Sequence, residues 1–341
     1  MLKCGITDSA AYLFIGLTSF VATKFVIYMF TEYYLPVLLV VFNIIELTIV
    51  FDGIGQAITP LVNVYRGEEN SVGIKRIMKT SLFYAIAEGL IMSLVMFIFG
   101  GTIARFFGLS ENNLIEIGKL ATRLISPFFF CTGVLFLMTT YYMIIEKVFL
   151  ATVITAIKDF AVPSAFMCIF GMLFGINGVW IGLGVAPFAS ILVVLLFIYL
   201  RYGREKFPLL LDKETKNIQI FDTELSAENV MKLRDSVEDY LVKNNVNSAS
   251  VNRIMLLIEE TCMEIYENNK QRKVSLECSV MIGSEIQMII RDDGDVRDIT
   301  DSDTRITSFR AYVLSQLMAR TPDKQNLVTT GYNRNVFRFK K

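Results

Sequence analysis

The sequence contains no histidine, and this absence excludes several kinds of site. Catalytic triads that use histidine, imidazole metal sites and phosphoacceptor histidines all need the imidazole ring. The five cysteines have no CxxC spacing, so neither a disulfide framework nor a zinc site is expected. The chain also has no excess of either charge, with 33 acidic and 33 basic residues, so nothing in its charge indicates nucleic-acid binding.

Apolar residues, by contrast, are abundant. The chain is 53% hydrophobic with a mean hydropathy of +0.50, which is too apolar for a single soluble globule. Six segments reach the length of about 20 apolar residues that a helix needs to cross a bilayer. We therefore predict an all-α bundle of six transmembrane helices in the cell membrane, embedded in the lipid bilayer. The predicted spans are 9–30, 35–62, 79–100, 118–143, 148–171 and 176–200.

Charged residues are unevenly distributed along the chain. Residues 1–211 hold 26 of them, whereas the shorter stretch 212–341 holds 40. This rise in charge density predicts a membrane domain at 1–202, a linker at 203–214 and a compact C-terminal domain at 215–341.

The basic residues near the span ends predict the orientation in the membrane. With a cytoplasmic N-terminus, nine Lys and Arg residues fall on the cytoplasmic side and three on the other, which favours this orientation and places both termini in the cytoplasm. The first apolar run carries Lys24 and leads into further spans, so it does not resemble a cleavable signal peptide. The stretch RGEENSVGIKRIMK (66–79) is predicted to be an amphipathic connector lying on the inner leaflet.

Ionisable and polar groups inside spans are costly and tend to be functional. Asn43 and Glu46 are spaced i,i+3, and Asp52 and Gln56 are spaced i,i+4, so each pair shares a helix face. An interfacial bend is an alternative position for Asp52, and kinks are expected at the span prolines, Pro36, Pro60 and Pro127. The candidate transport residues are Lys24, Asn43, Glu46 and Asp52. Glu88 is a further candidate, and the adjacent Lys158 and Asp159 are interpreted as candidates or as a locally neutralised pair.

Three stretches carry a family resemblance: LKCGITDSAAYLFIGLTSFVATKF at the start, GIGQAITPLVNVYRGEENSVGIKRIMKTS (53–81) and FGINGVWIGLGVAPF (174–188). Residues 1–202 resemble the C-terminal half of a multidrug and toxic compound extrusion (MATE) transporter. The resemblance implies a transporter built from two similar six-helix bundles that alternate access. It exports organic cations or other solutes, coupled to inward flow of Na⁺ or H⁺. Only one bundle is present here, so the second half is expected from a homodimer, a separate chain or further sequence.

The C-terminal domain shows alternating helical and strand patterns. Helical spacing predicts helices at 226–245 and 250–269, with Ser226 as an N-cap. Period-2 alternation around GS predicts a β-hairpin at 273–292. A helix at 307–320 and a strand at 335–341 complete the predicted elements, which together make an α/β sandwich.

The order of these elements resembles the GHKL ATPase family, in particular its anti-sigma-factor kinase branch, over residues 215–341. The resemblance implies ATP and Mg²⁺ as cofactors and assigns roles to particular residues. Glu260 in LLIEETCMEIYENN matches the general base, and Asp292 and Gly294 in IIRDDGDVRD match the turn that binds adenine. Glu264 falls where the family has its magnesium-binding asparagine, and Asn268 continues the same polar helix stripe as Glu260 and Glu264.

Several positions depart from the GHKL pattern. Val296 replaces the second glycine of the turn, and SFRAYVL (308–314), where the glycine-rich phosphate lid is expected, contains no glycine. A phosphate cradle depends on backbone N–H groups presented by glycines, although Arg305 and Arg310 are candidate substitutes. The partial motifs favour a non-enzymatic domain.

Three functions are consistent with these patterns. The favoured one is a membrane exporter, or half of one, with a regulatory nucleotide-binding-like cytoplasmic domain. The second is a membrane-anchored ATPase or Ser/Thr kinase of the anti-sigma type. The third is a nucleotide-independent interaction module on a membrane anchor, which recruits a cytoplasmic regulatory protein. A solvated loop that ends a strand is the simplest interpretation of the acidic stretch after 291.

Overall fold

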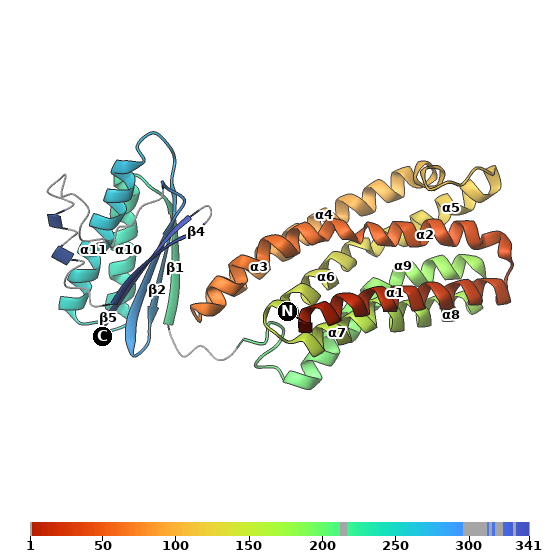
Figure 1. Ribbon diagram of the computed structural model, residues 1–341, viewed down its shortest axis with the longest axis horizontal. Coiled ribbons are helices and arrows are strands. Elements are labelled where there is room, and N and C mark those ends of the chain that lie inside the picture. The colour runs from red at the N-terminus through yellow and green to blue at the C-terminus, as the bar shows by residue number, and fades with distance from the viewer. Residues whose placement is uncertain are drawn as a thin grey trace. The chain divides into compact units, whose positions relative to one another are not determined.

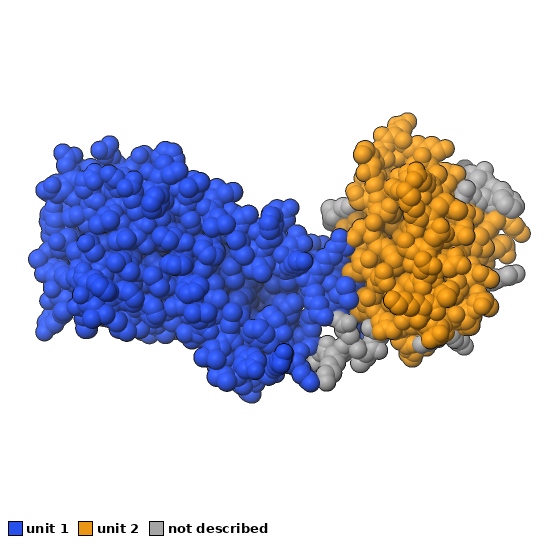
Figure 2. Space-filling model, turned by 180° about the vertical axis from the view of Figure 1, so that it is seen from behind, with its two compact units in different colours: residues 1–213 blue, residues 214–341 orange. Residues whose placement is uncertain are grey.

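The structure is a computed structural model that describes residues 2–211, 217–295, 323–329 and 332–340, together with residues 312, 313, 316 and 317. The chain divides into two compact units, Met1–Lys213 and Glu214–Lys341, which Figure 2 shows in different colours.

The first unit contains six helical segments that are long and apolar enough to cross a membrane, which confirms the predicted six-helix bundle (Figure 1). The segments are Ser9–Met29, Glu32–Gly67, Ser71–Phe106, Asn112–Ile144, Val148–Phe174 and Ile176–Tyr202. Their helices are α1 (Leu2–Met29), α2 (Leu35–Glu46), α3 (Asp52–Gly67), α4 (Ser71–Phe106), α5 (Asn112–Ile125), α6 (Phe129–Ile144), α7 (Val148–Ala156), α8 (Val162–Phe174) and α9 (Ile176–Tyr202).

Three spans change helix type partway along their length. The second span contains the 3₁₀ segment η2 (Leu47–Phe51), and the fifth contains the π-helical segment η4 (Ile157–Ala161). In the fourth span, the 3₁₀ segment η3 (Ser126–Phe128) coincides with Pro127, where a kink is predicted. Pro36 instead occupies the first turn of α2, where a missing N–H removes no helical bond, and Pro60 lies inside α3.

Residues 66–79 do not form a separate helix between α3 and α4, and their position at the inner leaflet stays a prediction. Helix α3 continues to Gly67 and α4 begins at Ser71, so the stretch is a tight hairpin followed by two turns of helix. The Asn70 side chain caps α4 by accepting a hydrogen bond from Gly73 N at 2.9 Å. This cap lets the helix start at once, which leaves no room for a separate surface helix.

Glycines allow the backbones of α8 and α9 to approach closely. A Cβ added at Gly178 would lie 1.9 Å from the carbonyl oxygen of Phe170, and one at Gly182 would lie 2.5 Å from that of Phe166. Gly184 meets α5 in the same way, because its added Cβ would lie 2.3 Å from the carbonyl oxygen of Leu124. Small residues at such contacts are typical of membrane helix packing. The pattern in FGINGVWIGLGVAPF is therefore a packing pattern.

The segment after α9 is held against the bundle by two tyrosines at the end of α6. The Tyr141 hydroxyl donates to the Leu209 carbonyl at 2.7 Å, and the Tyr142 hydroxyl donates to the Pro208 carbonyl at 2.6 Å. Leu209, Leu210 and Leu211 pack beside these rings. The chain therefore leaves the bundle along a fixed path.

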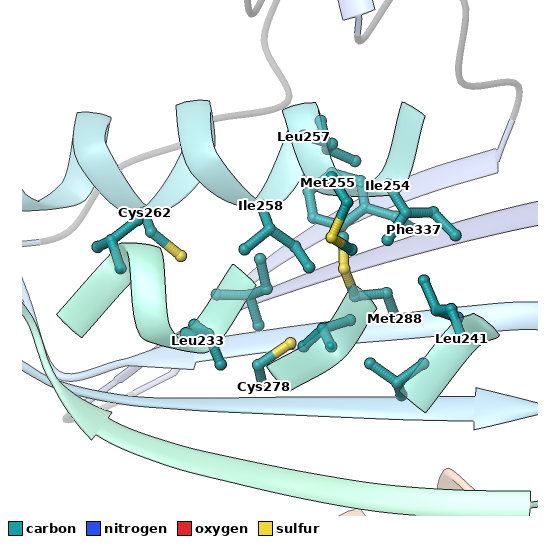
Figure 3. Packing of buried hydrophobic residues seen from close by; sticks show 14 of the residues in the cluster. Leu233, Leu241, Ile254, Met255, Leu257, Ile258, Cys262, Cys278, Met288 and Phe337 are labelled. Atoms are coloured by element: carbon teal, nitrogen blue, oxygen red, sulfur yellow. The ribbon is translucent and has the colours of Figure 1, made fainter. Parts of the chain in front are cut away.

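In the described residues, the second unit is a five-stranded antiparallel sheet with two long helices, α10 and α11, on one face. The strand order is β1-β2-β3-β5-β4, and the inward side chains of the helices and strands form one apolar core. Figure 3 shows Leu233 and Leu241 of α10 and Ile258 and Cys262 of α11 meeting Cys278 and Met288 from the sheet. The elements are β1 (Asn217–Glu224), α10 (Ala227–Lys243), α11 (Ser248–Asn268), β2 (Ser275–Ile282), β3 (Glu285–Asp292), β4 (Asp323–Thr329) and β5 (Tyr332–Lys340).

The predicted elements of this unit are present where the structure describes it. Helices α10 and α11 occupy the two predicted helical stretches, β2 and β3 form the predicted hairpin, and β5 is the predicted last strand. Of the predicted helix at 307–320, residues 312, 313, 316 and 317 are helical and the others lie outside the described residues. Strands β1 and β4 are additional, so the described fold is a small antiparallel sheet covered by two helices.

Candidate functional site

The second span places three of the predicted transport residues around its helix interruption. Glu46 is the last residue of α2 and Asp52 is the first residue of α3, so the two carboxylates bracket η2. Glu46 is exposed, whereas Asn43 and Asp52 are partly buried. Gln56 Nε2 donates to Asp52 Oδ2 at 2.6 Å, which agrees with the predicted i,i+4 pair. Irregular backbone at membrane depth is tolerated where it is buried in protein or lines a water-filled cavity.

The fourth predicted transport residue, Lys24 of α1, is also exposed, and its Nζ lies 5.9 Å from the centre of the Phe20 ring. No hydrogen bond or ion pair joins any two of the described residues Lys24, Asn43, Glu46 and Asp52. The structure therefore presents Lys24 and Glu46 on the bundle surface and does not gather the four groups into one closed site.

In the fifth span, Lys158 and Asp159 form the locally neutralised pair that is the simpler interpretation of their sequence. The Lys158 ammonium lies 2.6 Å from Asp159 Oδ2, with both side chains largely buried. The pair sits in η4, and a π-helical segment cannot be recognised from the sequence pattern.

In the second unit, the acidic turn (Asp292–Asp295) begins at Asp292, the last residue of β3. Asp292 is 2% exposed, so this carboxylate is not part of a solvated loop. Its Oδ1 accepts hydrogen bonds from Gly294 N at 3.0 Å and from Asn333 Nδ2 at 2.9 Å. A Cβ at Gly294 would lie 2.8 Å from Asp292 Oδ1 and 3.0 Å from Asn269 Nδ2. The glycine is therefore needed for close approach within the protein itself.

Two asparagines that the sequence pattern does not reveal hold this turn. Asn333 of β5 also donates to the Asp295 carbonyl at 3.0 Å. Asn269, at the C-terminal end of α11, accepts from Asp295 N at 2.9 Å through its Oδ1. The turn is thus fixed from a helix and from a neighbouring strand. Asn333 and Asn335 lie on the same side of β5 as Phe337 and Phe339, which face the core. This alternation is the only sign in the sequence that Asn333 points inward toward the turn.

In the polar stripe on α11 (Glu260, Glu264 and Asn268), two of the three side chains already interact with each other. Glu264 is buried, and Asn268 Nδ2 donates both to its carbonyl at 2.6 Å and to its Oε1 at 3.1 Å. Glu260, one turn earlier, is partly exposed. Among the described residues no group of three or more acidic or thiol side chains has the geometry to hold a metal ion. Glu264 therefore engages Asn268, and its predicted role as a metal ligand stays a prediction.

Several buried polar atoms at this end of the domain have no hydrogen-bond partner among the described residues. They are Asp292 Oδ2, Asn333 Oδ1, Asn335 Nδ2 and Thr261 Oγ1. Burial raises the pKa of the Asp292 carboxyl, although the hydrogen bonds from Asn333 and Gly294 oppose this shift. Burial likewise raises the pKa of the Cys278 thiol to about 12, so this cysteine is an inert core residue.

An open cleft of about 450 Å³ borders the turn at the end of the sheet. Its lining includes four carboxylates besides Asp292, from Asp222, Glu224, Glu277 and Asp293. A largely acidic lining repels phosphate groups unless a metal ion neutralises them. The positions on which phosphate binding depends lie outside the described residues: Val296, the candidate substitutes Arg305 and Arg310, and most of 308–314, where the phosphate lid is expected.

These features define the first unit as a polytopic helical membrane bundle with interrupted spans. Residues 9–176 match the family model described as MatE. This part of the chain is therefore similar to the MatE family, and the bundle has the fold of MATE transporters.

The bundle is similar to solved transporters in several states. One is a MATE protein in complex with MaL6, at 20% identity and a TM-score of 0.54, with 59% of this chain and 46% of that chain covered. A second is the inward-facing conformation of a multidrug resistance MATE family transporter of the MOP superfamily, at 21% identity and 0.54, with 58% and 46% covered. A third is a MOP superfamily transporter from Pyrococcus furiosus with reverse polarity of its binding pocket, at 20% identity and a TM-score of 0.53, with 59% of this chain and 45% of that chain covered.

At these identities the likeness shows the fold alone. The chain spans a little under half the length of the solved transporters that it matches. No curated protein matches the chain.

Proposed function

We propose that the membrane bundle is one half of an exporter that moves organic cations or other solutes against an inward flow of Na⁺ or H⁺. The observation that carries this proposal is the interrupted second span, with exposed Glu46 and partly buried Asp52 on either side of η2. Discontinuous membrane helices near the middle of the bilayer commonly form the substrate and ion sites of transporters.

The exposure of Glu46 supports a second half. A charged side chain facing lipid at this depth costs at least about 2.5 kcal/mol, so such groups face protein or a water-filled path. The match to a little under half of each solved transporter supports the same arrangement. The second half is another copy of this chain, a separate chain or further sequence.

Flux in proteoliposomes tests this function. With a Na⁺ or proton gradient, uptake of a cationic dye is expected, and Glu46→Gln should lower it at least about tenfold. Glu116→Gln, which removes an exposed acid of α5 that pairs with Lys119, should leave the flux unchanged. Absence of gradient-dependent flux, both for the chain alone and with a separately supplied six-helix half, would sink the proposal.

For the second unit we propose a regulatory domain that binds an adenine nucleotide without hydrolysing it. The support is Asp292: its Oδ1 is fixed by two donors, while its buried Oδ2 has no partner among the described residues. Such an oxygen suits an amino group of a base, since a buried acceptor gains most from a matching donor. Glu264 or its neighbours would hold Mg²⁺ if ATP binds with its metal.

Thermal unfolding of the full chain with ATP or ADP, with and without Mg²⁺, distinguishes the alternatives. Stabilisation by both nucleotides that Asp292→Asn abolishes supports the regulatory domain. Release of phosphate by the wild type would instead support the ATPase or kinase. If neither added nucleotide nor Asp292→Asn changes the Tm and the flux of the chain, the result would support the nucleotide-independent interaction module.

A further inference from the structure

The fifth span holds two adjacent charges near its middle. Lys158 and Asp159 are the eleventh and twelfth of the 27 residues in Val148–Phe174. At a rise of about 1.5 Å per residue they lie roughly 16 Å from the start of the span, within a hydrocarbon layer about 30 Å thick. A charge at this depth persists only where another group compensates it.

The compensation comes from within the pair. Lys158 Nζ donates to Asp159 Oδ1 at 2.8 Å and to Oδ2 at 2.6 Å, and the two side chains are only 14% and 15% exposed. Neighbouring side chains on a regular α-helix point about 100° apart and do not face each other. The ammonium group therefore folds back over the carboxylate at the π-helical turn, and one tethered cation occupies both carboxylate oxygens.

The first span holds this turn in place. Thr18 of α1 is buried, and its hydroxyl donates to the backbone carbonyl of Asp159. Phe14 of α1 stacks on Phe160, with ring centroids 6.3 Å apart. Helix α9 also packs against η4. The π-helical turn is thus packed against two other spans, and π-turns often lie at functional sites.

The neighbouring helices bring little further charge to the pair. Helices α7 and α8 contain no acidic or basic residue, and the only one in α9 is Arg201 in its last turn. Among the described side chains of α1, the one charged group is Lys24, which is exposed beside Phe20. Lys158 is therefore the cation that balances Asp159.

We propose that Lys158 is a built-in counter-cation that fills a monovalent-cation site at Asp159. A lysine ammonium is a compact point charge, so it takes the position that a small cation such as Na⁺ would take beside the carboxylate. The native bundle would then need no free cation here, and removal of the ammonium would open the site to one. This proposal concerns an internal site and holds whether or not the chain transports solutes.

The test compares the full chain and its variants in lipid nanodiscs, by thermal unfolding in Na⁺, K⁺ or choline at equal ionic strength. The wild type should have the same Tm in all three salts. Lys158→Met should be destabilised in choline, because a buried carboxylate loses its partner, and Na⁺ should raise its Tm by about 5 °C. Lys158→Arg keeps a tethered cation and should show no difference between salts.

A double variant, Lys158→Met with Asp159→Asn, removes the carboxylate as well and should be insensitive to the choice of cation. A flat response of Lys158→Met across the salts would overturn the proposal. So would failure of Lys158→Met to fold in any salt while the double variant folds, because the vacated carboxylate would then accept no cation. A shift of the wild type that equals the shift of Lys158→Met would also overturn it.

Discussion

The membrane bundle and the C-terminal domain hold their elements together by different contacts. In the bundle, α8 and α9 meet backbone to backbone at Gly178 and Gly182. In the domain, large side chains such as Ile258 and Met288 fill the space between the helices and the sheet. Lipid tails are as apolar as leucine, so close packing must replace the hydrophobic effect in the bundle, whereas water drives burial in the domain.

The two units also treat a buried carboxylate differently. Asp159 has both oxygens occupied by Lys158, whereas Asp292 has one oxygen fixed and the other without a partner among the described residues. In the first arrangement Lys158 neutralises Asp159 and occupies both of its oxygens. In the second, Asp292 Oδ2 is a buried acceptor without a donor among the described residues. The proposed ligand site in the domain rests on this second arrangement at Asp292, and the proposed transport site in the bundle rests on the exposed carboxylate of Glu46.

The largest effect is expected from a cavity in the domain core. Ile258→Ala removes a fully buried side chain from α11, so unfolding of the domain should become easier by about 2–5 kcal/mol. Leu256→Ala on the same helix is the matched control, because Leu256 is 41% exposed, and it should change stability by less than about 0.5 kcal/mol. Hydrogen exchange of the α11 amides measures both, and equal effects would contradict a core packed by side chains.

An added methyl group should be the corresponding defect in the bundle. Gly182→Ala places a Cβ 2.5 Å from the Phe166 carbonyl oxygen, so α8 and α9 must separate, at a cost of about 1–3 kcal/mol. Gly16→Ala in α1 has nothing within 4 Å and should be neutral. Thermal unfolding in nanodiscs compares the two. A tolerated Gly182→Ala would show that backbone contact does not stabilise the bundle.

The buried carboxyl of the acidic turn predicts a pH dependence. Its pKa is raised in the folded domain, so the unfolded chain gives up this proton at a lower pH than the folded chain does. Stability should therefore fall as the pH rises from about 4 through the raised pKa of Asp292. Hydrogen exchange of β3 at several pH values should show this decline in the wild type and not in Asp292→Asn. Asp293→Asn keeps Asp292 and should keep the decline.

The smallest effect is expected where the chain leaves the bundle. Tyr142→Phe removes one hydrogen bond to the Pro208 carbonyl, worth about 1 kcal/mol. Trypsin cleavage after Arg204 should then become about fivefold faster. Tyr84→Phe changes an exposed ring of α4 and serves as the control. An unchanged cleavage rate in Tyr142→Phe would mean that the tyrosine does not hold this segment.

Apolar length and period were sufficient to predict the six spans and the main helices and hairpin of the domain. Strand β4, with the sequence DKQNLVT, carries little apolar signal and is a strand because it pairs with β5. Strand β1 likewise depends on its partner β2. The acidic turn and Gly294 are visible in the sequence, but the clamp by Asn333 joins residues 41 positions apart and needs the fold.

Within the bundle, Glu46 and Asp52 are recognisable from the sequence as polar residues in an apolar span. The 3₁₀ segment between them is not, because the sequence LTIVF is equally compatible with an ordinary apolar α-helix. Lys158 and Asp159 are visible as neighbours, but the π-turn that lets them pair depends on Thr18 and on the packing of α1, α8 and α9. Composition indicates that a charge lies in the membrane, and the fold determines what compensates it.

The central claim is that the second span, with Glu46 beside its 3₁₀ segment, belongs to a solute exporter, so that Glu46 must be reachable from a water-filled path. Reaction with a membrane-impermeant charged maleimide tests it, since a thiol reacts as the hydrated thiolate. Glu46→Cys is compared with Ile91→Cys on α4, which is 63% exposed and lies at a similar distance from its span end, roughly 22 Å against 21 Å. Labelling of Glu46→Cys but not of Ile91→Cys in intact membranes is predicted. Equal labelling, or none at Glu46→Cys, would contradict the account.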